Sequence, residues 1–351
     1  MRRQSKVVKI GNMAIGGQNL IRVQSMTKTD TRDVEATISQ ILSLEEKGCE
    51  IVRVAVPDEE AAIAIPHIKR NIHIPLVADI HFDPRLAVLA IDNGADKIRL
   101  NPSNIKDLAW VREISLRAKD KGIPIRVGAN LGSFRERPAN VVEALVQSVL
   151  KEIEILEGVN FEDIVVSIKA SDVMTTIKAN EIIAKKVNFP IHLGITEAGL
   201  LETSLVKNSA GIGYLLMNGI GDTIRFSITD KPEKEVKAGF DLLRSLHLRD
   251  YGLEIISCPM CGRAEIGVQS IAKQLERRFS NVKVPLKVAV MGCAVNGPGE
   301  AMDADIGIAG GKKSGAIFRN GKIIKTENEI KLYRTFVKEL KNLIEERQKP
   351  S

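Results

Sequence analysis

The chain has 351 residues, four cysteines and a formal net charge of +7. This length exceeds one ordinary barrel or sheet domain, so one large and one small domain are expected. The sequence has no apolar run of about 18 residues, and its basic start lacks the apolar stretch of a signal peptide. We therefore expect a soluble, cytoplasmic protein with no membrane segment. Nucleic-acid binding is not expected, because aromatic residues make up only 4% of the chain and basic residues alternate with acidic ones.

A short apolar strand followed by a helical stretch recurs through the first 230 residues. A hairpin is expected first, over residues 6–17, where it could close a barrel floor. The strands that follow are predicted over residues 21–27, 51–57, 76–81, 97–102, 125–130, 163–170, 191–198 and 223–229. Eight β-then-α units match a (β/α)8 TIM barrel in number and size, which places the chain in the α/β class. An open doubly wound sheet is disfavoured, because no GxGxxG motif follows the first strand.

A second, smaller α/β domain is predicted over residues 251–351, after a barrel domain over residues 1–250. Its predicted strands cover residues 253–257, 285–292 and 304–311, with a helix over 266–280. A hairpin turning at Asn320-Gly321 and a long amphipathic helix complete the chain. About 100 residues of this kind are enough for an independent core.

Polar side chains occur near the carboxyl end of nearly every predicted barrel strand. In a TIM barrel these strand ends converge on the face where active sites form. Five of the polar residues are cations, namely Arg53, Arg99, Arg126, Lys169 and Arg225. Cations in a confined mouth repel one another strongly unless acidic groups or a bound anion offset them. The set predicts a site for a multiply charged anion; the alternative is that the arginines pair with Asp79 or Glu197.

Glu197 is the acidic residue at the end of the seventh predicted strand. A nearby anion favours the protonated form of a carboxyl group, and this form suits a proton donor. Glu197 is therefore a catalytic candidate. A structural ion pair with one of the arginines is the alternative.

Three cysteines of the second domain form a candidate metal site: Cys258 and Cys261 in a CxxC pair, and Cys293 after the strand over 285–292. No histidine lies beyond His247, so this set cannot complete a closed zinc site locally. A fourth ligand must be harder than sulfur, which favours an iron–sulfur centre with an exchangeable position. Zinc and a redox dithiol remain alternatives. The Gly-Pro-Gly bend that follows could return Glu300 toward Cys293.

Nine segments together resemble the 4-hydroxy-3-methylbut-2-enyl diphosphate synthase family in its two-domain bacterial form. They cover residues 21–33, 78–83, 97–104, 126–133, 167–172, 193–199, 219–229, 257–263 and 292–301. The resemblance implies a [4Fe-4S] cluster held by Cys258, Cys261, Cys293 and Glu300. Cys49 falls outside this pattern, and we interpret it as a buried core thiol.

The resemblance also implies a reaction of the methylerythritol phosphate route to isoprenoids. The substrate 2-C-methyl-D-erythritol 2,4-cyclodiphosphate would be reductively opened and dehydroxylated to 4-hydroxy-3-methylbut-2-enyl diphosphate. Two electrons would come from ferredoxin or flavodoxin through the cluster, with Glu197 as the acid and Glu300 as an exchangeable, catalytic ligand. Family members are head-to-tail homodimers. The implied substrate-binding residues are Arg53, Arg99, Arg126, Asn130, Lys169, Arg225 and Ser227.

Three other functions are compatible with parts of the sequence. The first is a different iron–sulfur barrel reductase that acts on another phosphorylated substrate. The second is a phosphate-binding barrel transferase, similar to dihydropteroate synthase, with a structural zinc module. The third is an RNA-binding protein that uses the +7 charge, but cations that point into a barrel mouth argue against an open binding stripe.

Overall fold

The computed structural model describes residues 2–81, 83–101, 104–105, 107–134, 136–293 and 301–349. The chain divides into two compact units, Met1–Arg249 and Asp250–Ser351. Within the described ranges, no helix combines the length and the apolar character needed to cross a membrane.

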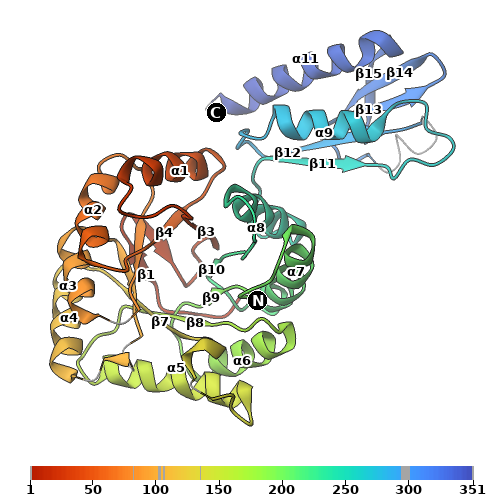
Figure 1. Ribbon diagram of the computed structural model, residues 1–351. Coiled ribbons are helices and arrows are strands. Elements are labelled where there is room, and N and C mark those ends of the chain that lie inside the picture. The colour runs from red at the N-terminus through yellow and green to blue at the C-terminus, as the bar shows by residue number, and fades with distance from the viewer. Residues whose placement is uncertain are drawn as a thin grey trace. The chain divides into compact units, whose positions relative to one another are not determined.

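The first unit is a barrel of parallel strands surrounded by helices (Figure 1). The strands pair in the order β8-β7-β6-β5-β4-β3-β10-β9, and a bridge between Val166 and Ile191 links the two ends. This arrangement confirms the predicted (β/α)8 TIM barrel. The strands are β3 (Arg22–Met26), β4 (Ile51–Ala55), β5 (Leu76–Asp79), β6 (Lys97–Arg99), β7 (Ile125–Ala129), β8 (Ile164–Ile168), β9 (His192–Leu193) and β10 (Thr223–Ile224).

Side-chain caps start most of the helices soon after a strand ends. At α1 to α6 an aspartate or asparagine accepts a hydrogen bond from a backbone N–H of the first turn, as Asp33 does from Ala36. These caps fix where each strand-to-helix loop ends and so help position the mouth residues. The helices are α1 (Val34–Glu46), α2 (Glu59–Lys69), α3 (Pro84–Asp92), α4 (Leu108–Asp120), α5 (Val141–Glu157), α6 (Val173–Lys186), α7 (Leu201–Met217) and α8 (Glu233–Ser245), with a short 3-10 turn η2 (Leu131–Ser133).

The expected hairpin forms an apolar plug at one end of the barrel. Strands β1 (Val8–Ile10) and β2 (Met13–Ile15) pair antiparallel. Their buried side chains pack against Ile51, Val77 and Val165 of the barrel strands. The plug fills the barrel interior at its amino-terminal end, and the polar strand ends lie at the opposite face.

Most predicted barrel strands end earlier than expected, and the last two do so where the backbone packs closely at the mouth. The strand predicted over 191–198 ends at Leu193, and the one predicted over 223–229 ends at Ile224. A Cβ on Gly194 would lie 2.6 Å from the Arg225 carbonyl oxygen and 2.7 Å from Lys169 Nζ. The backbone segments that follow β9 and β10 therefore approach each other too closely at this point for any residue but glycine.

The second unit is a five-stranded sheet with its own apolar core. Strands β11, β12 and β13 are parallel neighbours, and β14 and β15 extend the sheet antiparallel. Asn320 and Gly321 form the predicted tight turn, with φ of 48° and 73°. The elements are β11 (Leu253–Ser257), α9 (Val268–Arg278), β12 (Leu286–Met291), β13 (Ile306–Gly311), β14 (Ser314–Arg319), β15 (Lys322–Asn328) and α11 (Glu329–Gln348).

Candidate active site

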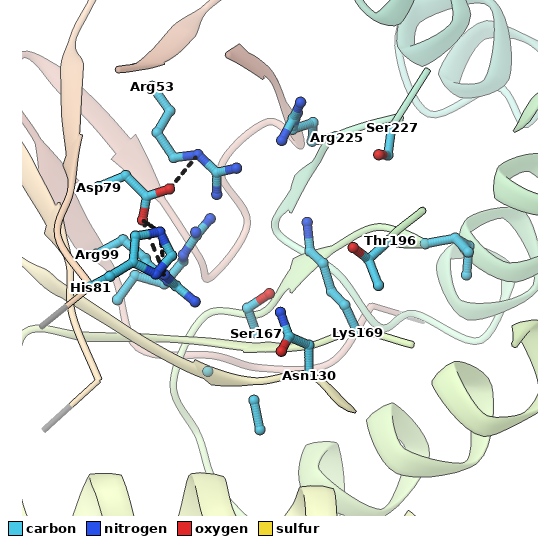
Figure 2. Close-up of a pocket in the computed structure, with 14 residues that line it drawn as sticks. Arg53, Asp79, His81, Arg99, Asn130, Ser167, Lys169, Thr196, Arg225 and Ser227 are labelled. Atoms are coloured by element: carbon cyan, nitrogen blue, oxygen red, sulfur yellow. Dashed lines mark hydrogen bonds and ion pairs between the residues drawn. The ribbon is translucent and has the colours of Figure 1, made fainter. Parts of the chain in front are cut away.

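A polar cavity of about 240 Å³ opens at the carboxyl ends of the barrel strands. Figure 2 shows side chains from several strands pointing into it. The structure brings together at this cavity all seven residues that the resemblance implies for substrate binding. They are Arg53, Arg99, Arg126, Asn130, Lys169, Arg225 and Ser227.

Asp79, the last residue of β5, is the buried counter-ion on one side of the cavity. Its Oδ2 lies 3.4 Å from Arg53 Nε, and its Oδ1 lies 3.2 Å from Arg99 Nη1 and 3.7 Å from His81 Nε2. Burial alone would raise the pKa of Asp79. The charge of Arg53, the neighbouring His81 side chain and the charge of Arg99 outweigh burial and hold this pKa well below its usual value. Asp79 therefore stays ionised and fixes two guanidinium groups.

Glu235 of α8 is the counter-ion of Arg225. Arg225 Nε and Nη2 lie 3.1 Å and 3.2 Å from the two carboxylate oxygens of Glu235. The same carboxylate accepts a hydrogen bond from Ser25 Oγ at 2.8 Å. Arg225 therefore pairs with both carboxylate oxygens of Glu235, on a helix behind the strands. This ion pair stands in place of the alternative pairing with Glu197.

Arg126 and Lys169 are two further basic side chains of the mouth, and no carboxylate of the described residues forms an ion pair with either. Arg126 is 3% exposed, and its Nη1 has no hydrogen-bond partner among the described residues. Lys169 Nζ lies 3.0 Å from Nε2 of the buried His192. Across the described part of the mouth, four guanidinium groups and the Lys169 amine thus face the carboxylates of Asp79 and Glu235. This imbalance creates a strongly positive potential, which favours a ligand with several negative charges.

Glu197 does not join this cavity. It is exposed and is not among the residues that line the cavity, whereas its neighbour Thr196 is. Its φ of 50° is left-handed, a conformation that costs a residue other than glycine on the order of 1–3 kcal/mol and is found mainly where function requires it. A catalytic role for Glu197 stays a prediction.

The three cysteines of the second unit lie near one edge of its sheet. Cys258 directly follows β11, and Cys293 follows β12, the parallel neighbour of β11. The Gly292 N–H donates to Cys258 Sγ at 3.1 Å. Hydrogen bonds from the backbone and side chain of Arg263 lower the pKa of the Cys261 thiol, and the Cys293 thiol also acts on the Arg263 charge.

These thiols are not arranged as a metal site in the described part of the chain, where no three His, Cys, Asp or Glu side chains form one. Glu300 lies outside the described residues. Three thiolates from adjoining loops are nevertheless a donor set that suits an iron–sulfur cluster or zinc. Cys49 belongs to the barrel unit, and its burial there confirms the expected core thiol and raises its pKa to about 12.

Sequence reasoning missed two buried bases inside the barrel, Lys97 and His192. Both are fully buried, and Lys97 Nζ has no hydrogen-bond partner among the described residues. The available signal was strand alternation: Lys97 lies two residues before Arg99, so both side chains point to the same inner face. The role of Glu235 carried no such signal, because its partner is ten residues away and on another element.

Replacing Lys97 by methionine is expected to raise the free energy of unfolding by about 1–3 kcal/mol at pH 7, because it removes a buried donor without a partner. Burial, and then the charges of Arg126 and Arg53, lower the pKa of Lys97 well below its usual value. Unfolding at neutral pH therefore takes up a proton, and the wild type gains stability as the pH rises toward about 10.4, the lysine value in an unfolded chain.

The difference in unfolding free energy between Lys97→Met and wild type should consequently shrink between pH 7 and 10, by up to about 1.4 kcal/mol per pH unit. Urea denaturation at several pH values measures it. Lys185→Met, at an exposed lysine of α6, is the control and should change stability by less than about 0.5 kcal/mol. An advantage that does not vary with pH would show that Lys97 is charged in the folded protein.

The fold and the site define a TIM-barrel protein with a cation-lined mouth and a separate α/β unit that carries three cysteines. Two family models match the chain, the GcpE TIM-barrel domain over residues 5–240 and the GcpE protein C-terminal domain over residues 254–342. The chain belongs to the GcpE family.

Curated relatives match almost the full length. Proteins named 4-hydroxy-3-methylbut-2-en-1-yl diphosphate synthase (flavodoxin) are similar to this chain in several bacteria. The protein from Caldanaerobacter subterraneus subsp. tengcongensis is 54% identical over 351 residues, 99% of each chain. The protein from Clostridium tetani is 52% identical over 97% of this chain and 99% of its own, and the Thermotoga maritima protein is 54% identical over 91% and 92%.

Solved structures of dihydropteroate synthases share the barrel. The enzyme from Stenotrophomonas maltophilia has a TM-score of 0.53 at 15% identity and covers 69% of this chain and 97% of its own. The enzyme from Xanthomonas albilineans in complex with 7,8-dihydropteroate has a TM-score of 0.52 at 17% identity, covering 69% and 99%. At such low identity these similarities show the fold alone.

Proposed function

We propose that this chain converts 2-C-methyl-D-erythritol 2,4-cyclodiphosphate to 4-hydroxy-3-methylbut-2-enyl diphosphate in the methylerythritol phosphate pathway. A ring carbon–oxygen bond to the diphosphate breaks, a hydroxyl leaves as water, and two electrons and one proton are consumed. The observation that carries this proposal is the mouth of the barrel, where four arginines and Lys169 face two carboxylates. The diphosphate named in the product of the relatives is a ligand of the required charge.

The barrel residues have distinct tasks in this reaction. The guanidinium groups of Arg53, Arg99 and Arg225 are already oriented by carboxylates and can offer their remaining N–H groups to phosphate oxygens. Arg126 brings a buried Nη1 that is unpaired among the described residues. Preorganised donors of this kind bind an anion with little loss of side-chain entropy. Asn130 and Ser227 add neutral hydrogen-bonding groups at the cavity wall.

For the electrons, we propose a [4Fe-4S] cluster held by Cys258, Cys261, Cys293 and Glu300. Such a cluster accepts and passes on single electrons. The three thiolates fit its preference for soft ligands, and a carboxylate is the ligand that exchanges most readily. Flavodoxin, which the names of the relatives print, is the proposed donor, with ferredoxin as the alternative. The cytoplasmic location and the head-to-tail homodimer stay predictions.

The test is an anaerobic assay with the cyclic diphosphate and either reduced flavodoxin or dithionite with a viologen. We expect the linear allylic diphosphate as product, together with about four irons and four sulfides per chain. Electron paramagnetic resonance of the reduced protein should show the cluster. One zinc per chain with no sulfide and no turnover would refute the proposal and favour a barrel protein with a structural zinc site.

A further inference from the structure

Lys169 is held at the mouth by a chain of hydrogen bonds that runs into the barrel. Its Nζ lies 3.0 Å from His192 Nε2, and His192 Nδ1 lies 2.8 Å from Thr223 Oγ1. Both His192 and Thr223 are fully buried. The absent side chain of Gly194 leaves the space that Nζ occupies, because a Cβ there would lie 2.7 Å from it. The amine therefore has one fixed position beside the cavity.

The charges around this amine are mostly positive. Among the described residues, those on the elements packed against it and around the cavity are Arg53, Asp79, His81, Lys97, Arg99, Arg126, Glu152, His192, Arg225 and Glu235. Arginine keeps its proton in proteins, whereas lysine and histidine can lose theirs. The arrangement therefore favours the loss of a proton from the lysine and histidine side chains of this set, Lys169 among them.

Burial is the largest cause that lowers the pKa of Lys169 well below its usual value. The charges of Arg126, Arg53 and Arg225 act in the same direction, and Glu235 opposes them only in part. The pKa of His192 is likewise lowered, by burial and then by Lys169 and Arg126. Without a ligand, the site therefore favours the neutral form of both groups. A bound dianion reverses the sign of the local field and raises the pKa of the nearer amine.

We propose that Lys169 takes up a proton from solvent when the anionic substrate binds. The reaction later consumes this proton. The identity of the anion rests on the proposed function above. His192 is the positioning residue: with its Nδ1–H donating to Thr223, its Nε2 accepts a hydrogen bond from either the amine or the ammonium form of Lys169. No rearrangement is then needed when the proton arrives.

The proton balance closes over one turnover. One proton passes from solvent to Lys169 Nζ on binding. The two electrons from the reduced carrier form the carbon–carbon double bond as the ring carbon–oxygen bond and the carbon–hydroxyl bond break. The ring oxygen stays on the diphosphate, the departing hydroxide takes the Lys169 proton to give water, and Lys169 is neutral again.

Calorimetric titration of the full-length protein tests the uptake without any turnover. The cyclic diphosphate is added without reductant at pH 7.5, in Tris, HEPES and PIPES, whose ionisation enthalpies differ. The phosphates of this ligand each carry one strongly acidic oxygen, so the ligand itself does not titrate near neutral pH. We expect the binding enthalpy to rise with buffer ionisation enthalpy, with a slope of about one proton per bound ligand. Binding with zero slope would overturn the proposal.

Four variants locate the proton. Lys169→Arg, which carries a permanent charge, and Lys169→Met, which carries none, should both reduce the slope to near zero. The second of them covers the case in which arginine does not fit beside Gly194. Lys97→Met and His81→Gln remove two further bases near the cavity and should keep the slope. Loss of the slope in either of these two would assign the proton elsewhere and contradict the proposal.

The pH dependence of affinity provides a second readout. Because the ligand favours the protonated amine, the wild-type Kd should increase as the pH rises, by up to tenfold per pH unit between the pKa of free and bound Lys169. In Lys169→Arg this dependence should disappear. A ligand that does not bind at all would defeat both proposals. Binding with proton uptake but without reductive turnover would support the role of Lys169 and defeat only the proposed function.

Discussion

Replacing Asp79 by asparagine is expected to lower the free energy of unfolding by about 3–5 kcal/mol, because it leaves buried guanidinium groups without their counter-charge. Asp79 is 4% exposed and contacts both Arg53 and Arg99. Asparagine keeps the shape of the side chain but not its charge. The change therefore isolates the electrostatic contribution from packing.

Urea denaturation of Asp79→Asn and wild type measures the difference. Asp241→Asn is the control, since Asp241 is 39% exposed where it pairs with Lys237 and Arg244, and such pairs contribute about 0–1 kcal/mol. The folded-state pKa of Asp79 is depressed, so its contribution is present above the unfolded value near 3.9 and is lost as the pH falls through the lower folded value. The difference should therefore be constant between pH 5 and 8.

A multiply charged anion should partly rescue this variant. The cyclic diphosphate can supply the counter-charge that asparagine lacks, so its addition should raise the midpoint of Asp79→Asn more than that of wild type. A loss of unfolding free energy of less than about 1 kcal/mol, with equal stabilisation of variant and wild type by the anion, would contradict the prediction. It would show that the buried arginines do not need the charge of Asp79 for stability.

The periodicity of the sequence was sufficient to predict the barrel and the residues at its mouth. Strand and helix periods differ clearly along the first unit, and strand ends in a TIM barrel can meet at only one face. For this reason the sequence alone could assign Arg53, Arg126 and Lys169 to one site. The floor hairpin was predictable in the same way, from two short apolar runs around a Gly-Asn turn at residues 11–12.

The counter-charges could not be predicted, because they depend on contacts between distant elements. Glu235 lies on the buried face of α8, among residues such as Val236 and Phe240. Only the packing of that helix on β3 brings it to Ser25 and Arg225. Local spacing contains no information about such a contact.

Glu197 illustrates a different limit. Its position at the end of a predicted strand suggested a side chain that points into the mouth. The strand ends early at Leu193, and the backbone then turns through a left-handed residue, so alternation no longer fixes the direction of the side chain. For the cysteines, spacing placed Cys258 and Cys293 after two strands, and the parallel pairing of β11 with β12 brings those strand ends together. The choice between iron and zinc follows from ligand chemistry and not from this geometry.

Replacing Cys261 by alanine is expected to abolish the iron–sulfur centre and, with it, all reductive turnover. Two thiolates and a carboxylate are too few ligands for a stable cluster. Cys261 is exposed and lies outside the apolar core of its unit, whereas Cys258 packs against that core. Cys261→Ala should therefore remove the proposed ligand without unfolding the protein, unlike the small metal domains that collapse without their metal.

Iron and sulfide analysis and visible absorbance measure the cluster content of the variant, and circular dichroism measures whether it is folded. Cys49→Ala makes the same chemical change at a thiol buried in the barrel and should keep full iron, sulfide and turnover. Both variants should still bind the cyclic diphosphate with wild-type proton uptake, because the barrel mouth is intact in each. Full iron and sulfide in Cys261→Ala would remove that residue from the ligand set. Loss of anion binding along with the iron would show instead that the barrel site depends on the cluster. Anion binding and electron transfer could then no longer be assigned to separate groups of residues.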